Sequence, residues 1–487
     1  MLVCKDKLGN FGPKSGANPL DIFRGKRVVC YEANEIPLRV FRWFAESYPR
    51  STVAQLMRQS TVVETVTRDK GHLSPWTSWP TMHRGVIDEQ HGIYDFGQDL
   101  RDVNAEYPPI WDLLSRGGVR VGMFGSLQSY PLPDNVSDYA FYVPDTFAAG
   151  PECFPQTLSA FQQFNLAMVD RSGRNVSGGL PLRDAAKFLA AAPGLGLRGA
   201  TVVKLAQQVA AERLKPNRVV RRRTSQMQIA FDFFLKELKS GTPEAAFFFT
   251  NHVASSMHRY WPALFPNDYP EDKWGRNWRT EFSDEIAFAM RQLDSQLADL
   301  VAFVKSDPRY TLAVASSMGQ AATDDDVVRS QLLFSDIGRF MTALEVPAGK
   351  WRSKRAMAPL YMVSVDEDAA DMFETRLGML RINGRPLEFS RRAEGVFRIE
   401  IGHANLVESE IRIDYGNSIL TPAELGMSVT IIQDETGSYA YHIPEGSLLV
   451  FDPNGPAVPV SRQMDTREYA PALLRNFGLE IPAHMLR

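Results

Sequence analysis

The chain has 487 residues, of which 44% are hydrophobic and 23% are charged, and both values are ordinary for a globular protein. Its 54 basic and 57 acidic residues leave a formal net charge of −3. This balance argues against nucleic acid or an anionic membrane surface as the main partner. No stretch approaches the roughly 18 apolar residues of a membrane span, so we expect no integral membrane segment.

The cysteines and the N-terminal residues bear on the compartment. Cys4, Cys30 and Cys153 are scattered and have neither disulfide-framework nor zinc-ribbon spacing. The first residues also lack the basic run and apolar core of a signal peptide. We therefore expect a soluble, cytoplasmic protein, and the sequence leaves its oligomeric state open.

Four short apolar runs predict buried strands at 26–31, 119–124, 245–250 and 310–315. Helical spacing of apolar residues predicts helices between them, most clearly at 281–305. This alternation is typical of an α/β fold with a doubly wound, mostly parallel sheet and helices on both faces. Residues 69–98 are rich in Gly, Pro, His and Trp and predict a long ordered loop, a kind of segment that often carries function.

Residues 346–425 have a different pattern, with short β-like runs separated by turn signals such as Asn383-Gly384. We interpret them as a β-rich inserted module. Residues 1–345 then form the core, and residues 426–487 return to it.

Polar side chains follow several of the predicted strands. In open α/β sheets, ligands bind beyond the carboxyl ends of the strands. Glu32 and Glu35 directly follow the first strand, where carboxylates suit a divalent cation or acid/base work. Acids at a helix start, where they favour the helix dipole, are the alternative reading of the same two residues.

The segment 76–85 gathers hydroxyls, a histidine and an arginine in one turn bounded by Pro and Gly. A hydroxyl at a helix start is well placed to attack phosphorus or sulfur, because backbone N–H groups stabilise anions there. Simple helix capping by the hydroxyls is the alternative.

A third cluster at 250–261 follows the third strand and contains two of the chain's 8 histidines, His252 and His258. Imidazoles bind transition metals or move protons, although hydrogen-bonded core histidines are the alternative. Gln320 follows the fourth strand, and His442 lies on a later hairpin.

In this order the segments resemble the alkaline phosphatase superfamily, especially its type I phosphodiesterase and sulfatase-like branches. The resemblance rests on an acid after the first strand, the loop 76–95, His258 four residues after Ala254, the turn 317–319, and His442 before Gly446. The closing segments 469–474 and 477–482 also look like that superfamily's last helix and loop. The resemblance covers roughly residues 26–330 and 430–487, and it implies an alkaline-phosphatase-like fold.

The departures from the family pattern concern metal ligands. The family's aspartate ligand falls on Ala254, and its Asp-His ligand pair falls on Ser317 and Met318. Alanine has no ligand atom, and a thioether is a poor ligand for zinc or a hard cation. The family's two-metal mechanism therefore does not carry over, and we expect at most one divalent metal ion, either zinc, manganese or magnesium.

Two functions remain open at this point. The first is a hydrolase or transferase that acts on a phosphate or sulfate ester, for example a nucleotide-linked or polysaccharide precursor, at a single-metal or metal-free site. The second is a catalytically inactive protein that binds an anionic sugar or a protein partner. For the enzyme, the candidate catalytic residues are Ser78 with Thr77 as its rival nucleophile, His83 and His258. The candidate metal ligands are Glu32, Glu35, His252 and His442, and the candidate substrate-binding residues are Asn34, Trp76, Asn251, Arg259 and Gln320.

Overall fold

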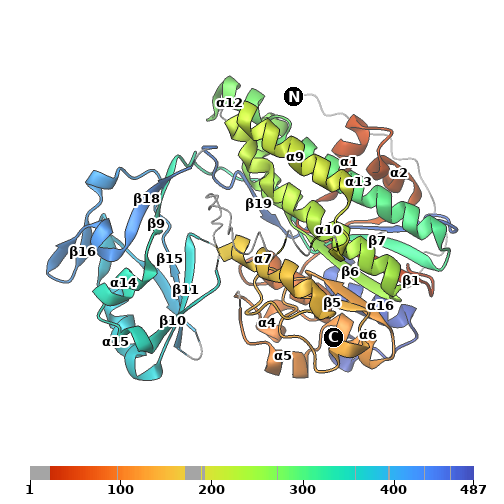
Figure 1. Cartoon of the computed structure of the whole chain (residues 1–487), viewed down its shortest axis with the longest axis horizontal. Coiled ribbons are helices and arrows are strands. Elements are labelled where there is room, and N and C mark those ends of the chain that lie inside the picture. Colours follow the sequence, from red (N-terminus) through yellow and green to blue (C-terminus); the bar gives the residue numbers. More distant parts are fainter. Residues whose placement is uncertain are drawn as a thin grey trace.

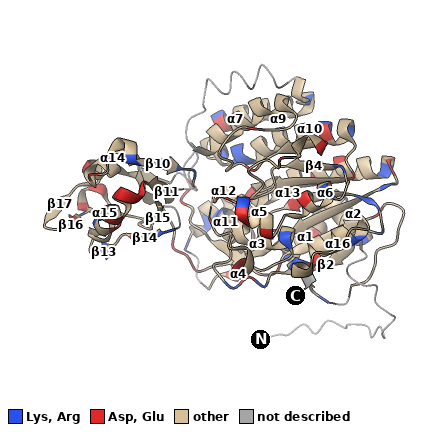
Figure 2. Ribbon diagram, turned by 90° about the horizontal axis from the view of Figure 1, so that it is seen from below, with Lys and Arg blue, Asp and Glu red and all other residues tan. Residues whose placement is uncertain are grey.

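The computed structural model describes residues 22–486 except 96, 171–187, 189–191, 193, 271–272, 357, 393–394, 433 and 461. The described residues form two bodies, which Figure 1 shows side by side. We call residues 22–329 and 432–486 the core lobe, and residues 330–431 the module. Lys and Arg (blue) and Asp and Glu (red) are interspersed along the ribbon of both bodies in Figure 2, in keeping with the small net charge.

The core lobe is built on a seven-stranded sheet with the strand order β2-β20-β7-β1-β6-β4-β5. Its central strands are parallel, and β20 runs antiparallel to both β7 and β2. The strands are β1 (Arg27–Ala33), β2 (Thr61–Val63), β4 (Val121–Phe124), β5 (Phe141–Val143), β6 (Ala245–Thr250), β7 (Tyr310–Ser316) and β20 (Ser447–Phe451).

Side chains of β1 alternate between two apolar cores, one on each face of the sheet. Val29 and Tyr31 belong to the first core, whereas Val28 and Cys30 belong to the second. The first core is covered by α1 (Leu38–Ser47), α2 (Thr52–Gln59), α7 (Ser159–Asp170), α10 (Arg222–Gly241), α11 (His252–Leu264) and α13 (Glu285–Ser306). The second is covered by α3 (Pro75–Arg84), α6 (Ile110–Arg116) and α16 (Tyr469–Asn476). The predicted doubly wound, mostly parallel α/β sheet is therefore confirmed.

The remaining core-lobe elements lie around this sheet. The further helices are α4 (Asp88–His91), α5 (Arg101–Glu106), α9 (Gly199–Leu214) and α12 (Gly275–Phe282). The short strands are β3 (Thr65–Val66), which pairs with β21 (Met464–Asp465), and β8 (Gly319–Ala322), which pairs with β19 (Ala440–Ile443). No helix in the described part of the chain is both long enough and apolar enough to cross a membrane.

The module has its own apolar core and three antiparallel sheets. The first contains β10 (Trp351–Lys354), β11 (Leu360–Val365), β15 (Val396–Glu400) and β14 (Glu388–Arg391). The second contains β13 (Arg385–Pro386), β12 (Leu380–Ile382), β16 (Ile413–Tyr415) and β17 (Ser418–Leu420), and the third pairs β9 (Ser330–Phe334) with β18 (Met427–Ile431). Helices α14 (Ile337–Ala343) and α15 (Glu367–Gly378) complete it. Leu332 and Met427 share this core, so the packed unit extends beyond the predicted range 346–425 at both ends.

Residues 69–98 depart from the predicted long loop, because α3 and α4 lie within them. The side chain of Ser74 caps α3, and Pro75 occupies its first position, where a missing N–H costs nothing. Gly85 ends the helix with a φ of 66°, a left-handed conformation that favours glycine. The sequence pattern indicated a helix start in 76–85, but the internal Pro80 and the scarcity of strong helix formers left the length of this helix undefined.

Candidate functional site

The turn after β1 places the Glu35 carboxylate. Glu35 has a φ of 59°, which is uncommon for a residue with a side chain and requires support from its surroundings. Neighbouring strand ends supply that support, because the Asn34 N–H donates to the Thr250 carbonyl at 3.0 Å and the Ile36 N–H donates to the Ser316 hydroxyl at 3.0 Å. The turn is thereby fixed between β6 and β7, at the carboxyl edge of the sheet.

Glu35, His258 and His442 form one compact group, which we call the Glu-His-His cluster. The Glu35 Oε2 atom lies 2.9 Å from His258 Nε2 and 3.3 Å from His442 Nε2. One ligand atom from each residue lies within 4.8 Å of the other two, and no other group of this kind occurs among the described residues. The members come from the turn after β1, from α11 and from β19, so the fold brings together segments that are far apart in the sequence.

The outward-facing nitrogen of each histidine ring is held by a backbone carbonyl. His258 Nδ1 lies 2.6 Å from the Ala440 carbonyl, and His442 Nδ1 lies 2.7 Å from the Leu73 carbonyl. Since a carbonyl only accepts, both Nδ1 atoms carry hydrogen and both Nε2 atoms face the Glu35 carboxylate. Histidine ligands of metal ions typically have this second bond, because it fixes the tautomer and the ring orientation.

The electrostatics of the cluster depend on the two rings. Burial by itself raises the pKa of the Glu35 carboxyl, but the facing His442 and His258 outweigh it and hold this pKa well below its usual value. The carboxylate is therefore ionised over the whole physiological pH range. An ionised carboxylate and two imidazoles that share one focus constitute a donor set suited to a divalent transition metal.

Gln320, on β8, completes the buried side of the cluster. Its Nε2 donates to Glu35 Oε2 and to the Ala254 carbonyl, the latter at 3.2 Å. Its Oε1 is buried and has no hydrogen-bond partner within the described structure. A buried amide oxygen without a partner costs about 1–3 kcal/mol, so this atom suits a polar group that the protein itself does not provide.

The distances in the cluster fit one metal ion. In a tetrahedral zinc site with ligand bonds of about 2.0 Å, neighbouring ligand atoms lie about 3.3 Å apart. The two measured separations from Glu35 Oε2 are 2.9 and 3.3 Å, close to that value. Two imidazoles and a carboxylate favour zinc or manganese over magnesium, which prefers oxygen ligands.

Glu32 lies apart from the cluster, in a fully buried network beneath the sheet edge. Its Oε1 is 2.7 Å from His83 Nε2, and its Oε2 accepts a 2.7 Å hydrogen bond from the Ser126 hydroxyl. The side chains of Glu32 and His83 are 0% and 1% exposed. Both carboxylate oxygens are thus engaged by protein groups. Together with Ala254, Ser317 and Met318, all of which are buried, this arrangement does not fit a second metal ion.

His252 and Arg259 are also placed elsewhere. The Nδ1 atom of His252 contacts the Thr250 hydroxyl, and its Nε2 contacts the Ala289 carbonyl at 3.2 Å. Burial lowers the pKa of His252 to about 4, so the ring is neutral. Arg259 lies 3.5 Å from the Asp434 carboxylate and is largely buried. The structure therefore separates these two residues from the Glu-His-His cluster.

The candidate nucleophiles Ser78 and Thr77 are shielded from solvent. The Ser78 hydroxyl is 2.8 Å from the Ser317 hydroxyl, and neither residue is exposed. Thr77 is 1% exposed. Because a nucleophile must touch its substrate, either hydroxyl requires a local opening before it can react.

Three of the predicted substrate-binding residues form one hydrogen-bonded chain with the cluster. The Trp79 indole donates to Asn34 Oδ1 at 2.8 Å, and the Asn34 amide donates to Glu35 Oε1 and to Asn251 Oδ1 at 2.7 and 2.8 Å. Asn251 is exposed, so it faces the solvent side of the site. Trp76 lies at the junction with the module, where its ring meets Phe147 edge-on at 4.5 Å. Gln320 is the third predicted residue in the hydrogen-bonded chain, because its amide donates to Glu35.

Two aromatic residues at the open side were missed by the sequence reasoning. The Tyr441 ring lies 4.1 Å from the His442 ring and 5.8 Å from the His258 ring. The Tyr441 hydroxyl is 3.4 Å from His72 Nε2. In the sequence, only the position of Tyr441 next to His442 could have indicated that Tyr441 belongs to the site. Nothing beyond its residue type indicated His72.

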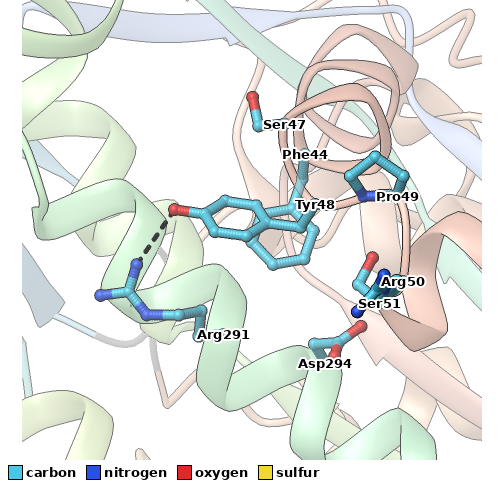
Figure 3. A pocket seen from close by; sticks show the side chains of 8 residues that line it. All are labelled: Phe44, Ser47, Tyr48, Pro49, Arg50, Ser51, Arg291 and Asp294. Carbon is cyan, nitrogen blue, oxygen red and sulfur yellow. Dashed lines mark hydrogen bonds between the residues drawn. The ribbon is translucent and has the colours of Figure 1, made fainter.

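A separate concavity of about 500 Å³ lies away from this chemistry. It is lined by Phe44, Ser47, Tyr48, Pro49, Arg50, Ser51, Arg291 and Asp294, and Figure 3 shows the Tyr48 ring over Phe44 with Arg291 bonded to the Tyr48 hydroxyl. None of the predicted site residues lines it, so we base the functional assignment on the Glu-His-His cluster.

Comparison with known proteins gives matches among solved structures. No protein-family model matches the chain, and no curated protein matches it. Murine ectonucleotide pyrophosphatase/phosphodiesterase 5 is 11% identical, with a TM-score of 0.40 over 94% of this chain and 96% of that one. Phosphonoacetate hydrolase from Sinorhizobium meliloti 1021 is 10% identical, with a TM-score of 0.38 over 93% and 97%.

A third similar structure is TAB5 alkaline phosphatase, a mutant with magnesium bound, which is 9% identical, with a TM-score of 0.35 over 94% of this chain and 100% of that one. The proposed chemistry rests on this chain's own side chains.

Proposed function

We propose that the protein is a hydrolase or transferase that acts on a phosphate or sulfate ester and uses one divalent metal ion at Glu35, His258 and His442. The observation that carries this proposal is the orientation of the two rings. Each Nδ1 is fixed by a carbonyl, and both Nε2 atoms face the same Glu35 oxygen. A shared cation gives the two Nε2 lone pairs and the Glu35 oxygen one common partner.

A divalent ion in this cluster supplies Lewis-acid polarisation of an ester oxygen. The chain's own residues orient the reactants around it. Asn34 holds the Glu35 carboxylate from one side, and exposed Asn251 presents an amide toward the substrate. The unpartnered Gln320 Oε1 accepts a hydrogen bond from a hydroxyl or a water molecule. Ser78, with Thr77 as its rival, is the nucleophile once its contact with Ser317 opens.

The substrate is an anionic small molecule or glycan, such as a nucleotide-linked or polysaccharide precursor, and the proposed compartment is the cytoplasm. The buried free thiols of Cys30 and Cys153 support a reducing compartment, whereas Cys4 lies outside the described residues.

The test is a screen of phosphate and sulfate esters, nucleotide sugars included, with and without added zinc, manganese and magnesium. We expect turnover of at least one ester that requires zinc or manganese and falls at least about a hundredfold in His442→Ala. Ser78→Ala abolishes this turnover and Thr77→Ala does not, if Ser78 is the nucleophile. Turnover that persists in a chelator and in His442→Ala would refute the proposed site.

The complete burial of the Ser78 hydroxyl favours a second candidate, a catalytically inactive protein that binds an anionic sugar or a protein partner. In that case every ester in the screen is left intact. Ser78→Ala and His258→Ala then leave ligand affinity largely unchanged, whereas the enzyme loses activity in both variants.

A further inference from the structure

The module presents one face of its first sheet to the core lobe. Side chains alternate along a strand, and on β15 Phe397 and Ile399 enter the module's own core. Val396 points the other way, because it packs with Met362 of β11 against Trp76 and Phe147 of the core lobe. The face that carries Val396 and Met362 therefore faces the core lobe beside Trp76, close to where α3 begins.

Arg398 lies on this same face. It is two residues beyond Val396 on β15, and it is the direct cross-strand partner of Met362 on β11. Its partner on the other side is Ser390 of β14. The Ser390 hydroxyl is buried and has no hydrogen-bond partner within the described structure. A guanidinium and an unsatisfied hydroxyl thus stand side by side on a surface that faces the core lobe.

This face lies near the Glu-His-His cluster, because Val396 and Met362 pack on Trp76, three residues after Leu73, whose carbonyl holds the His442 ring. Arg392 of the module lies 3.0 Å from the Asp95 carboxylate of the core lobe, and Arg355 donates to the Ala148 carbonyl. Burial first, then the charges of His442 and Arg398, lower the pKa of His72. His72 contacts Tyr441, whose ring lies against His442.

The present partner of Arg398 leaves it free to bind an anion. Its Nη2 donates to Glu400 Oε2 at 3.0 Å, with side-chain exposures of 37% and 38%. An ion pair this exposed is weak, so a ligand oxyanion can replace Glu400 at little cost. Guanidinium groups are suited to planar oxyanions, which they bind through two parallel hydrogen bonds.

We propose that Arg398 is a specificity-determining residue that binds a second oxyanion of the substrate, so that the preferred substrate is an ester with another phosphate or carboxylate group beyond the reacting one. The inference rests on the proposed function, because it places the reacting ester at the Glu-His-His cluster.

The test measures binding of phenyl phosphate and of 2-, 3- and 4-carboxyphenyl phosphate to the zinc-loaded full chain by calorimetry. We expect at least one carboxylated ester to bind more tightly than phenyl phosphate. Arg398→Ala should weaken the binding of that carboxylated ester about tenfold or more and change the affinity for phenyl phosphate by less than about twofold. The affinity of Arg398→Lys for the carboxylated ester should lie between those of the wild type and Arg398→Ala.

Arg412→Ala is the matched control. Arg412 pairs with the acid two residues on, Asp414, as Arg398 does with Glu400, but it lies directly before β16 of the module's second sheet. We expect no change in this variant. Equal weakening of both ester types by Arg398→Ala, or no weakening, would overturn the inference while leaving the proposed function intact. If the wild type binds no ester at all, the proposed function fails and this inference fails with it.

Discussion

His252 offers a quantitative test of the separation between the cluster and the buried core. Its ring accepts from Thr250 at Nδ1 and donates to the Ala289 carbonyl at Nε2, so both nitrogens are used and the ring is neutral. Burial lowers its pKa to about 4 in the folded protein, against 6.5 for an unperturbed histidine. The difference corresponds to roughly 3 kcal/mol of stability.

The sign of this contribution follows from the two states. Below pH 6.5 the unfolded chain gains a proton on His252, whereas the folded protein resists protonation down to about pH 4. The stabilisation is therefore complete above pH 6.5 and is lost as the pH falls toward 4. His252→Gln removes the titration while keeping an amide donor for Ala289. Between pH 7 and pH 4 the wild type should lose about 3 kcal/mol more than the variant.

Urea unfolding at a series of pH values, followed by tryptophan fluorescence, measures this difference. Seven of the 8 tryptophans lie in the core lobe, so the signal reports mainly on the lobe that contains His252. Parallel pH profiles for the two proteins would refute the buried neutral ring. Loss of bound zinc in His252→Gln would instead show that His252 is a metal ligand, as the sequence pattern suggested.

Three further predictions concern the cluster and its supports. Free zinc at one hundred times its Kd should raise the unfolding free energy of the wild type by about 2.7 kcal/mol. It should not raise that of His258→Ala, and an equal effect in both proteins would argue against the site. Gly319→Ala should lower the free energy of unfolding by about 1–3 kcal/mol, because its Cβ would lie 2.3 Å from the Glu445 carbonyl. An unchanged urea midpoint would contradict the close packing of β8. Glu32→Gln should keep the zinc content of the wild type, because Glu32 contacts His83 and not the cluster. It should lower the free energy of unfolding by about 1–3 kcal/mol. Metal analysis checks the first result and urea unfolding the second.

The central sheet could be predicted because its strands are short and buried on both faces. The run Ala245–Thr250 was predicted with its exact ends, since a continuous apolar segment between turn signals has few alternatives. The module's ends were harder to predict. β9 and β18 pair with each other across almost the whole module, and no local signal in either strand indicates such a distant partner.

The choice among histidines required geometry that the sequence pattern leaves open. His252 and His258 both lie on α11, six residues apart, which at about 100° per residue places them about 240° apart around the helix. Only one of them can therefore face the cluster. Likewise, Glu32 belongs to β1 and meets His83 of α3, whereas Glu35 lies beyond the strand in a left-handed turn. Arg398 could not have been predicted, because its place depends on how the module packs against Trp76.

Counting zinc in purified protein after equilibrium dialysis tests the central claim most directly. The claim predicts one zinc ion per chain in the wild type, in His252→Gln and in Glu32→Gln, and none in Glu35→Gln, His258→Ala or His442→Ala. Two ions per chain, or an unchanged content in the last three variants, would contradict it.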